Sequence, residues 1–140
     1  MADKKTQLAV IGAGPGGYAA AFLAADLGMD VTLIDPAENP GGVCLYRGCI
    51  PSKALLHVAR LINETAEAAN WGVSFGKPKI DIKKLRQWKS DVVTGLTNGL
   101  GRLATQRKIE HLRATAVFAD ERTLSLTDKD DKTSTLAFSH

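Results

Sequence analysis

Two short hydrophobic runs near the start of the chain predict buried strands. Leu8–Ile11 and Val31–Ile34 each contain four consecutive apolar or β-branched residues, as is typical of a parallel sheet covered on both faces. Between them, the stretch Gly14–Leu27 has small residues three and seven positions after Gly17, on one face of a helix. This order of strand, helix and strand predicts a βαβ unit.

Apolar residues recur every three or four positions in two later stretches, which predict amphipathic helices. The first stretch runs from Pro51 to about Asn70. A connection with glycine and proline follows, and the second helix then runs to about Arg107 with Asp81 as its N-cap. Glycines in its later part are expected to weaken it. We expect its apolar stripe to be core or subunit contact; the stripe consists of Ile82, Leu85, Trp88, Val92, Leu96, Leu100 and Leu103.

Short strands are expected in the last third of the chain, near 109–112, 115–118, 123–126 and 135–138. The polar run Asp128–Asp131 predicts a turn between the last two. With the βαβ unit, these strands predict an α/β fold that begins like a Rossmann domain and ends in a small antiparallel β-meander.

Composition and charge narrow the possible functions. A chain of 140 residues with 44% hydrophobic residues is long enough for one domain or part of one. The net charge of +3 is spread along the chain, which argues against nucleic-acid binding. We see no run as long as a membrane span, no metal-ligand spacing, and no signal peptide, so a cytoplasmic protein is expected. His57 and His111 are expected to be packed or solvated rather than catalytic.

A glycine-rich turn follows the first predicted strand. Gly12, Gly14 and Gly17 form the pattern Gly-x-Gly-x-x-Gly between a strand and a helix, the context in which it indicates a dinucleotide site. The three glycines permit a tight turn, close approach of a pyrophosphate and close helix packing. Asp35, at the end of the second strand, is expected to bind ribose hydroxyls. The pattern alone does not separate FAD from NAD.

Both cysteines of the chain, Cys44 and Cys49, lie shortly after this unit. A straight helix would separate positions five apart by roughly 7.5 Å, whereas a disulfide needs Cα atoms within about 4.4–6.8 Å. The segment must therefore bend if the two are bridged. Pro51 suits the first turn of a helix, which places Cys49 near a helix N-terminus that favours its thiolate. We therefore expect Cys49 to be the stabilised thiolate and Cys44 the more accessible, attacking sulfur.

The segment Gly41–Lys53 reads Gly-Gly-Val-Cys-Leu-Tyr-Arg-Gly-Cys-Ile-Pro-Ser-Lys. It resembles the redox-active disulfide motif of the pyridine nucleotide–disulfide oxidoreductase family. The continuation to His57 is most similar to members that oxidise dihydrolipoyl groups, with mercuric reductase or a non-catalytic flavin-binding fragment as alternatives. Tyr46 and Arg47 depart from the commoner Asn-Val pair of the motif.

The resemblance implies a function and further site residues. It implies FAD at the first fingerprint, with Gly42, Lys53 and Ala116 among the cofactor-binding residues and Cys44 and Cys49 as the catalytic dithiol. The implied reaction oxidises dihydrolipoamide with NAD⁺ as final acceptor. The implied partners are a lipoyl-bearing acyltransferase or lipoyl protein of a 2-oxo acid dehydrogenase complex, and a second copy of the protein in a homodimer.

The resemblance covers nearly all of this sequence. These residues correspond to only about the first third of a family member. It therefore implies that residues 1–140 are the N-terminal part of the FAD-binding domain. The NAD domain and the interface domain of such a protein lie outside these residues. We expect a fragment of this length to be inactive by itself.

Overall fold

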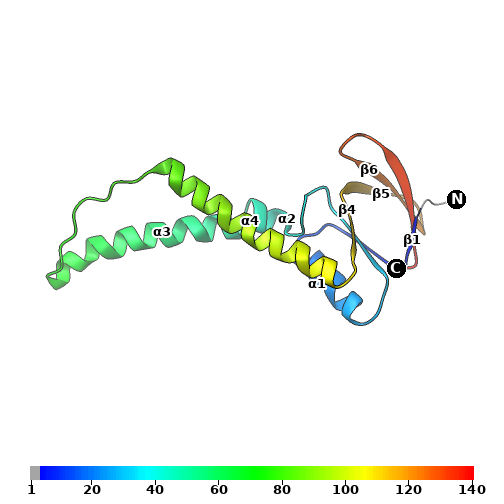
Figure 1. Cartoon of the computed structure of the whole chain (residues 1–140), viewed down its shortest axis with the longest axis horizontal. Coiled ribbons are helices and arrows are strands. Elements are labelled where there is room, and N and C mark those ends of the chain that lie inside the picture. The colour runs from blue at the N-terminus through cyan, green and yellow to red at the C-terminus, as the bar shows by residue number, and fades with distance from the viewer. Residues whose placement is uncertain (1–3) are drawn as a thin grey trace.

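A computed structural model describes residues 4–140 of the chain. Two sheets and one short helix lie at one end of the molecule, and two long helices form an arm that extends away from them (Figure 1). The helices are α1 (Pro15–Asp26), α2 (Gly42–Tyr46), α3 (Cys49–Glu67), the 3₁₀ helix η1 (Ala68–Trp71) and α4 (Ile82–Gln106). The strands are β1 (Lys4–Thr6), β2 (Leu8–Ile11), β3 (Val31–Ile34), β4 (Glu110–Leu112), β5 (Ala114–Asp120), β6 (Thr123–Asp128) and β7 (Thr133–Phe138).

The first sheet is parallel, with strand order β2-β3-β4. All four residues of β3 are buried, as predicted for this hydrophobic run. The prediction that β2 is buried is wrong, because β2 is an edge strand whose residues are half-buried or, at Ile11, exposed. Helix α1 covers this sheet through Ala21 and Ala24, which pack with Leu33 in one hydrophobic core. The small side chains let the helix lie close to the strand.

The second sheet contains the predicted antiparallel meander β5-β6-β7. Leu124, Leu126 and Leu136 form its buried core, which also contacts Ile34 of the first sheet. Strand β1, which the sequence analysis did not predict, pairs in parallel with β7. The α/β, Rossmann-like fold class with an added meander is therefore confirmed.

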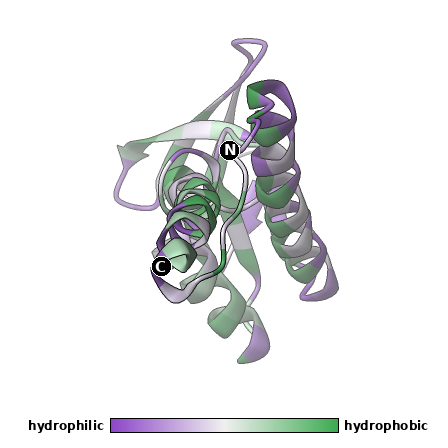
Figure 2. Ribbon diagram, turned by 90° about the vertical axis from the view of Figure 1, so that its left-hand side faces the viewer, coloured by the Kyte–Doolittle hydropathy of each residue, from purple (hydrophilic) through white to green (hydrophobic). Residues whose placement is uncertain are grey.

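The arm consists of the two predicted long helices. Hydrophobic and hydrophilic residues alternate along the helical ribbons (Figure 2). The Asp81 side chain accepts a hydrogen bond from the Lys84 amide at 3.0 Å, which confirms Asp81 as the N-cap of α4. The glycines of α4 do not end it. A Cβ at Gly101 would lie 2.1 Å from Asn39 Oδ1, so this glycine makes room for the loop after β3.

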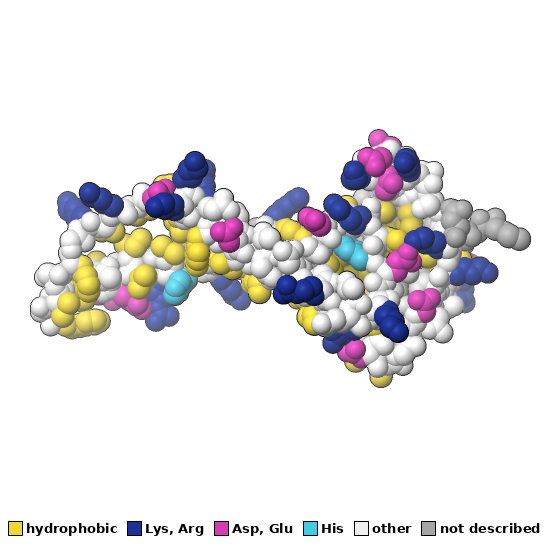
Figure 3. Space-filling view, viewed as in Figure 1, with side chains coloured by type: hydrophobic (Ala, Val, Ile, Leu, Met, Phe, Trp, Pro, Cys, Tyr) yellow, Lys and Arg dark blue, Asp and Glu magenta, His cyan; other side chains and the backbone are white. Residues whose placement is uncertain are grey.

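The apolar stripe predicted on α4 is not the core of this chain. The buried residues of α4 are Val93, Thr97 and Ala104, whereas Leu96 and Leu103 of the stripe are exposed. Thr97 is buried because α2 lies against α4 at this point, so that a Cβ on Gly41 would be 3.1 Å from Thr97 Cγ2. Hydrophobic side chains remain visible along the arm, with Lys and Arg at its outer edges (Figure 3). No helix among residues 4–140 is both long and apolar enough to span a bilayer.

Candidate functional site

The glycine-rich turn joins β2 to α1 and leaves the start of α1 open. Gly12 has φ +92°, a left-handed conformation that favours glycine, and its amide donates to the Ile34 carbonyl at 2.8 Å. Gly14 is the N-cap of α1, and a Cβ there would have no atom within 4 Å. A Cβ at Gly17 would lie 1.8 Å from the Gly12 oxygen. Gly17 is thus required by packing, whereas Gly14 faces open space beside a helix N-terminus.

Gly42 brings the cysteine segment directly against this turn. It has φ +57°, and a Cβ there would lie 2.5 Å from Gly14 Cα. The neighbouring Gly41 amide donates to the Ala13 carbonyl at 2.8 Å. Two glycines far apart in the sequence therefore meet at backbone distance, and no other residue type fits at position 42. The dithiol segment and the dinucleotide-type turn form one site.

Asp35 connects the turn to the loop that follows β3. One carboxylate oxygen accepts a hydrogen bond from the Ala13 amide at 2.8 Å, and the other accepts one from the Ala37 amide at 2.9 Å. Each carboxylate oxygen can accept a second hydrogen bond, so the side chain keeps acceptor capacity for a ligand. Sequence reasoning assigned Asp35 to ligand binding and missed its structural role.

The two cysteines lie on either side of a break between two helices. Cys44 is inside α2, and Cys49 is the first residue of α3, after Gly48 as N-cap. The predicted bend and the predicted position of Cys49 at a helix N-terminus are confirmed. Both thiols are free, and their mutual hydrogen bond is the main cause that raises the pKa of the Cys44 thiol above its ordinary value. The positive charge of Lys53 acts in the opposite direction.

The expected order of accessibility of the cysteines is wrong for this chain. Cys49 is exposed, whereas Cys44 is half-buried. The reason is that α2 packs between α3 and α4, which covers Cys44, while the first turn of α3 lies at the surface. The chain itself therefore does not shield the thiol at the helix N-terminus.

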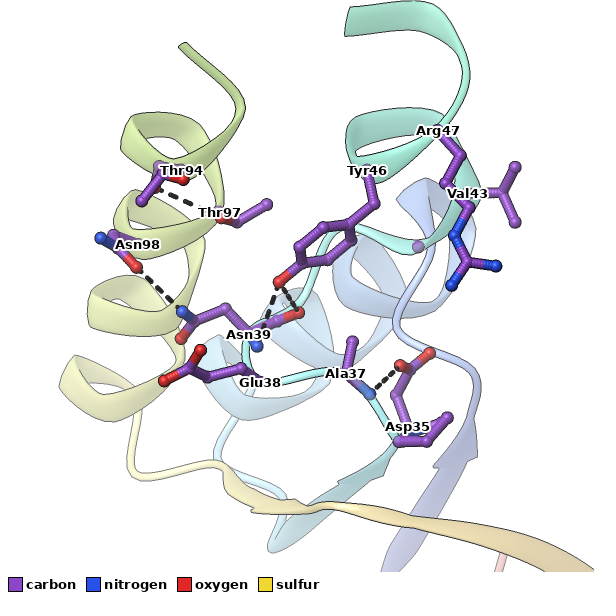
Figure 4. Close-up of a pocket in the computed structure, with 12 residues that line it drawn as sticks. Asp35, Ala37, Glu38, Asn39, Val43, Tyr46, Arg47, Thr94, Thr97 and Asn98 are labelled. Atoms are coloured by element: carbon purple, nitrogen blue, oxygen red, sulfur yellow. Dashed lines mark hydrogen bonds between the residues drawn. The ribbon is translucent and has the colours of Figure 1, made fainter. Parts of the chain in front are cut away.

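A cavity of about 640 Å³ lies between the loop after β3, α2 and α4 (Figure 4). On one side, the Tyr46 hydroxyl donates to the Asn39 carbonyl at 3.0 Å and accepts from the Asn39 amide at 3.3 Å. The Asn39 side-chain amide in turn donates to Asn98 Oδ1 at 3.0 Å. On the other side, the Arg47 side chain runs past Val43 toward the Asp35 carboxylate (Figure 4).

The Tyr46–Asn39–Asn98 network was not predicted from the sequence, in which the departure from Asn at position 46 was its one visible signal.

The structure brings most of the predicted site residues together, but not all. Asp35 and Gly42 line the cavity, and Gly42 contacts the turn at Gly14. Lys53 is exposed on α3, one turn after Cys49. Ala116 lies in β5, half-buried against the meander core, and does not line this cavity. Residues 4–140 contain no group of three or more His, Cys, Asp or Glu side chains that could hold a metal ion.

Known proteins resemble this chain over almost its whole length. The family described as pyridine nucleotide-disulphide oxidoreductase matches residues 6–140. A protein of Buchnera aphidicola subsp. Acyrthosiphon pisum named dihydrolipoyl dehydrogenase is 50% identical over 127 residues, which are 91% of this chain and 27% of that protein. Proteins of the same name from Vibrio cholerae and Haemophilus influenzae are each 46% identical, over 92% and 96% of this chain.

The chain spans just over a quarter of the length of these curated relatives. The family match covers both the glycine-rich turn and the cysteine segment, which the structure joins into one site. The chain therefore belongs to the pyridine nucleotide-disulphide oxidoreductase family.

Proposed function

We propose that residues 1–140 supply the dithiol and part of the FAD site of an enzyme that oxidises protein-bound dihydrolipoamide, with NAD⁺ as final electron acceptor. One observation carries the proposal: Gly42, which begins the helix of Cys44, lies against Gly14 at the N-terminus of α1. A dithiol and a dinucleotide turn in backbone contact are suited to electron transfer between sulfur and a bound dinucleotide. The names of the relatives support dihydrolipoamide as the substrate.

The residues present fit FAD. Gly14 leaves free the space that a Cβ would fill, so a diphosphate can approach the backbone at the start of α1, where the helix dipole favours an anion. Asp35 keeps acceptor capacity for the ribose hydroxyls. Lys53 would hold a positive charge near the flavin ring, and Ala116 would offer its backbone to the cofactor. When bound, FAD supplies the two-electron, hydride-transferring chemistry that no side chain provides.

The two cysteines would have different roles. One substrate thiol would attack Cys44 of the Cys44–Cys49 disulfide, forming a mixed disulfide and releasing Cys49 as the thiolate. The second substrate thiol would then resolve the mixed disulfide, so that the substrate becomes a disulfide and the two cysteines become a dithiol. The N-terminus of α3 would stabilise Cys49 as the thiolate. Since the chain leaves Cys49 exposed and half-buries Cys44, this division of roles requires bound flavin to shield Cys49.

We propose a lipoyl-bearing acyltransferase or lipoyl protein as the partner, and a homodimer as the working form. Both follow from the names of the relatives and from family membership. The dithiol of the partner's lipoyl group would exchange with the Cys44–Cys49 pair at Cys44. The relatives extend well beyond the residues matched by this chain. We assign the nicotinamide site to that further part.

Alkylation of the complete protein tests this proposal. After reduction, limited treatment with iodoacetamide and peptide mass spectrometry would give the order in which the two thiols react, without FAD and with FAD. We expect Cys49 to react first in the apoprotein and Cys44 first in the FAD-loaded protein. An order that does not change with FAD would contradict the assigned roles.

A second measurement tests the FAD site and the reaction themselves. Gly17→Val is expected to abolish FAD retention and NADH formation from dihydrolipoamide and NAD⁺. Gly76→Val serves as the matched control, because a Cβ at Gly76 would have no atom within 4 Å. Full FAD retention by the Gly17 variant would refute the assignment of the turn.

A further inference from the structure

Arg47 is the cationic residue among those that line the cavity beside the glycine-rich turn. It is exposed, and among residues 4–140 it takes part in no ion pair within 4.0 Å. The acidic residues of the lining are Asp35 and Glu38. Arg47 points toward Asp35 without forming an ion pair with it, and Glu38 lies on the opposite side of the cavity (Figure 4). The Arg47 guanidinium thus faces the cavity and is not ion-paired with either carboxylate of its lining.

The backbone of α2 aims this side chain at the dinucleotide turn. Arg47 is the C-cap of α2, and its amide donates to the Val43 carbonyl at 2.9 Å. Its side chain runs back past Val43 toward Asp35 (Figure 4). Val43 directly follows Gly42, the residue that lies against Gly14.

We propose that Arg47 binds the diphosphate of the FAD molecule, opposite the N-terminus of α1. This inference rests on the proposed function, because it assumes that FAD occupies the turn. The planar guanidinium offers paired N–H donors that match phosphate oxygens in a bidentate arrangement. The N-terminus of α1 supplies backbone N–H groups and a partial positive charge from the other side. The dianion would thus be held between a helix terminus and a side chain from the dithiol segment.

FAD binding to the complete apoprotein provides the test, read from the quenching of flavin fluorescence. Arg47→Gln is expected to raise the Kd for FAD by about ten- to a hundredfold, the usual effect of losing a hydrogen bond to a charged group. Arg47→Lys is expected to give an intermediate Kd, because lysine keeps the charge and loses the paired donors. Arg86→Gln, an equal charge change at an exposed position of α4, should leave the Kd unchanged.

Salt dependence separates a phosphate contact from a general loss of structure. The Kd of the wild-type protein should rise more steeply with KCl concentration than that of Arg47→Gln, because a contact between charges is screened by salt. Parallel salt dependences for the two proteins would overturn the proposal. Thermal melting of each apoprotein shows whether a variant is folded, and Arg47→Lys keeps the proposal testable if Arg47→Gln unfolds.

Competition with ADP and adenosine locates the contact on the ligand. In Arg47→Gln, the Kd of ADP obtained from competition should rise by the same factor as the Kd of FAD, and the Kd of adenosine should not change. An equal rise in the Kd of ADP and of adenosine would assign Arg47 to the nucleoside and overturn the diphosphate contact. A normal Kd in Arg47→Gln, alongside lost FAD binding in Gly17→Val, would overturn this inference alone. Unchanged FAD binding in Gly17→Val would instead refute the proposed function.

Discussion

Alanine at two glycines of the same turn should have opposite effects on stability. Gly14 and Gly17 both belong to the dinucleotide pattern, but the structure separates their roles. A Cβ at Gly14 would have no atom within 4 Å, and Gly14 has φ −70° and ψ 179°, which alanine adopts readily. A Cβ at Gly17 would lie 1.8 Å from the Gly12 oxygen, where ordinary contact begins at 3.4 Å.

The magnitudes follow from these two environments. Gly14→Ala should stabilise the apoprotein by about 0.4–1 kcal/mol, since alanine restricts the unfolded chain without straining the fold. Gly17→Ala should destabilise it by about 3 kcal/mol, the upper end for overpacking, because the neighbouring atom is backbone and α1 must move away from the turn. FAD binding should weaken in both variants. For Gly14→Ala we expect a loss of about tenfold or more, because the added methyl occupies the space left for the diphosphate.

Urea unfolding of the complete apoprotein and FAD titration measure the two effects separately. Gly76→Ala is the matched control, since a Cβ there would have no neighbour within 4 Å and the residue lies in the connection before α4. We expect it to leave FAD affinity unchanged. Equal destabilisation by Gly14→Ala and Gly17→Ala would refute the separation of a binding glycine from a packing glycine. Normal FAD affinity in Gly14→Ala would refute the position assigned to the diphosphate.

Three further variants test the local structure. Asp81→Ala should cost about 1 kcal/mol of unfolding free energy by removing the N-cap of α4, with Asp81→Asn close to wild type in the same urea titration. Tyr46→Phe should cost about 1 kcal/mol by removing the hydroxyl bonded to Asn39, and faster amide hydrogen exchange at Asn39 would report the freed loop. Burial lowers the pKa of His111 in the fold, so the unfolded chain protonates first and stability falls as pH drops below the ordinary His pKa of about 6.5. His111→Leu should therefore lose less stability than wild type between about pH 7.5 and 5.5, and an equal loss would contradict this cause.

Elements marked by a continuous local pattern could be predicted from the sequence. Strands β2 and β3 have the predicted bounds because each is an unbroken apolar run ended by glycine or aspartate. Helix α4 begins where Asp81 caps it, as a side chain that accepts an amide hydrogen bond predicts. The glycines in the later half of α4 did not predict where the helix ends. Gly101 is required by its close contact with Asn39, and helix propensity does not explain it.

Elements that depend on partners distant in the sequence could not be predicted. Strand β1 has exposed lysines and forms only because β7, more than 100 residues later, offers a free edge. Helix α2 has five residues between glycines, which is too short for a periodic pattern. The accessibility of the cysteines likewise depends on α2 packing between two long helices, which no local feature of residues 44 and 49 reveals.

The same limit applies within the candidate site, where the residue types were predicted and their contacts were not. The motif identified Gly42 as a site residue. The structure shows why glycine is needed there: the Gly42 backbone lies in close contact with Gly14. Asp35 was assigned to ribose, yet its two hydrogen bonds to Ala13 and Ala37 also hold the turn and the loop in place. A substitution at Asp35 would therefore disturb both, so loss of ligand affinity there would not by itself establish a direct contact.

The unusual pair Tyr46 and Arg47 can change both walls of the cavity without moving the dithiol. Adjacent residues on a helix project about 100° apart, so Tyr46 contacts Asn39 on one side while Arg47 runs past Val43 on the other (Figure 4). The hydrogen-bond partner of the Cys44 thiol is Cys49, and neither Tyr46 nor Arg47 takes that place. The loop anchor and the proposed diphosphate contact therefore have separate partners. The segment between the cysteines thus has room to tune cofactor binding while the two sulfur atoms keep their positions.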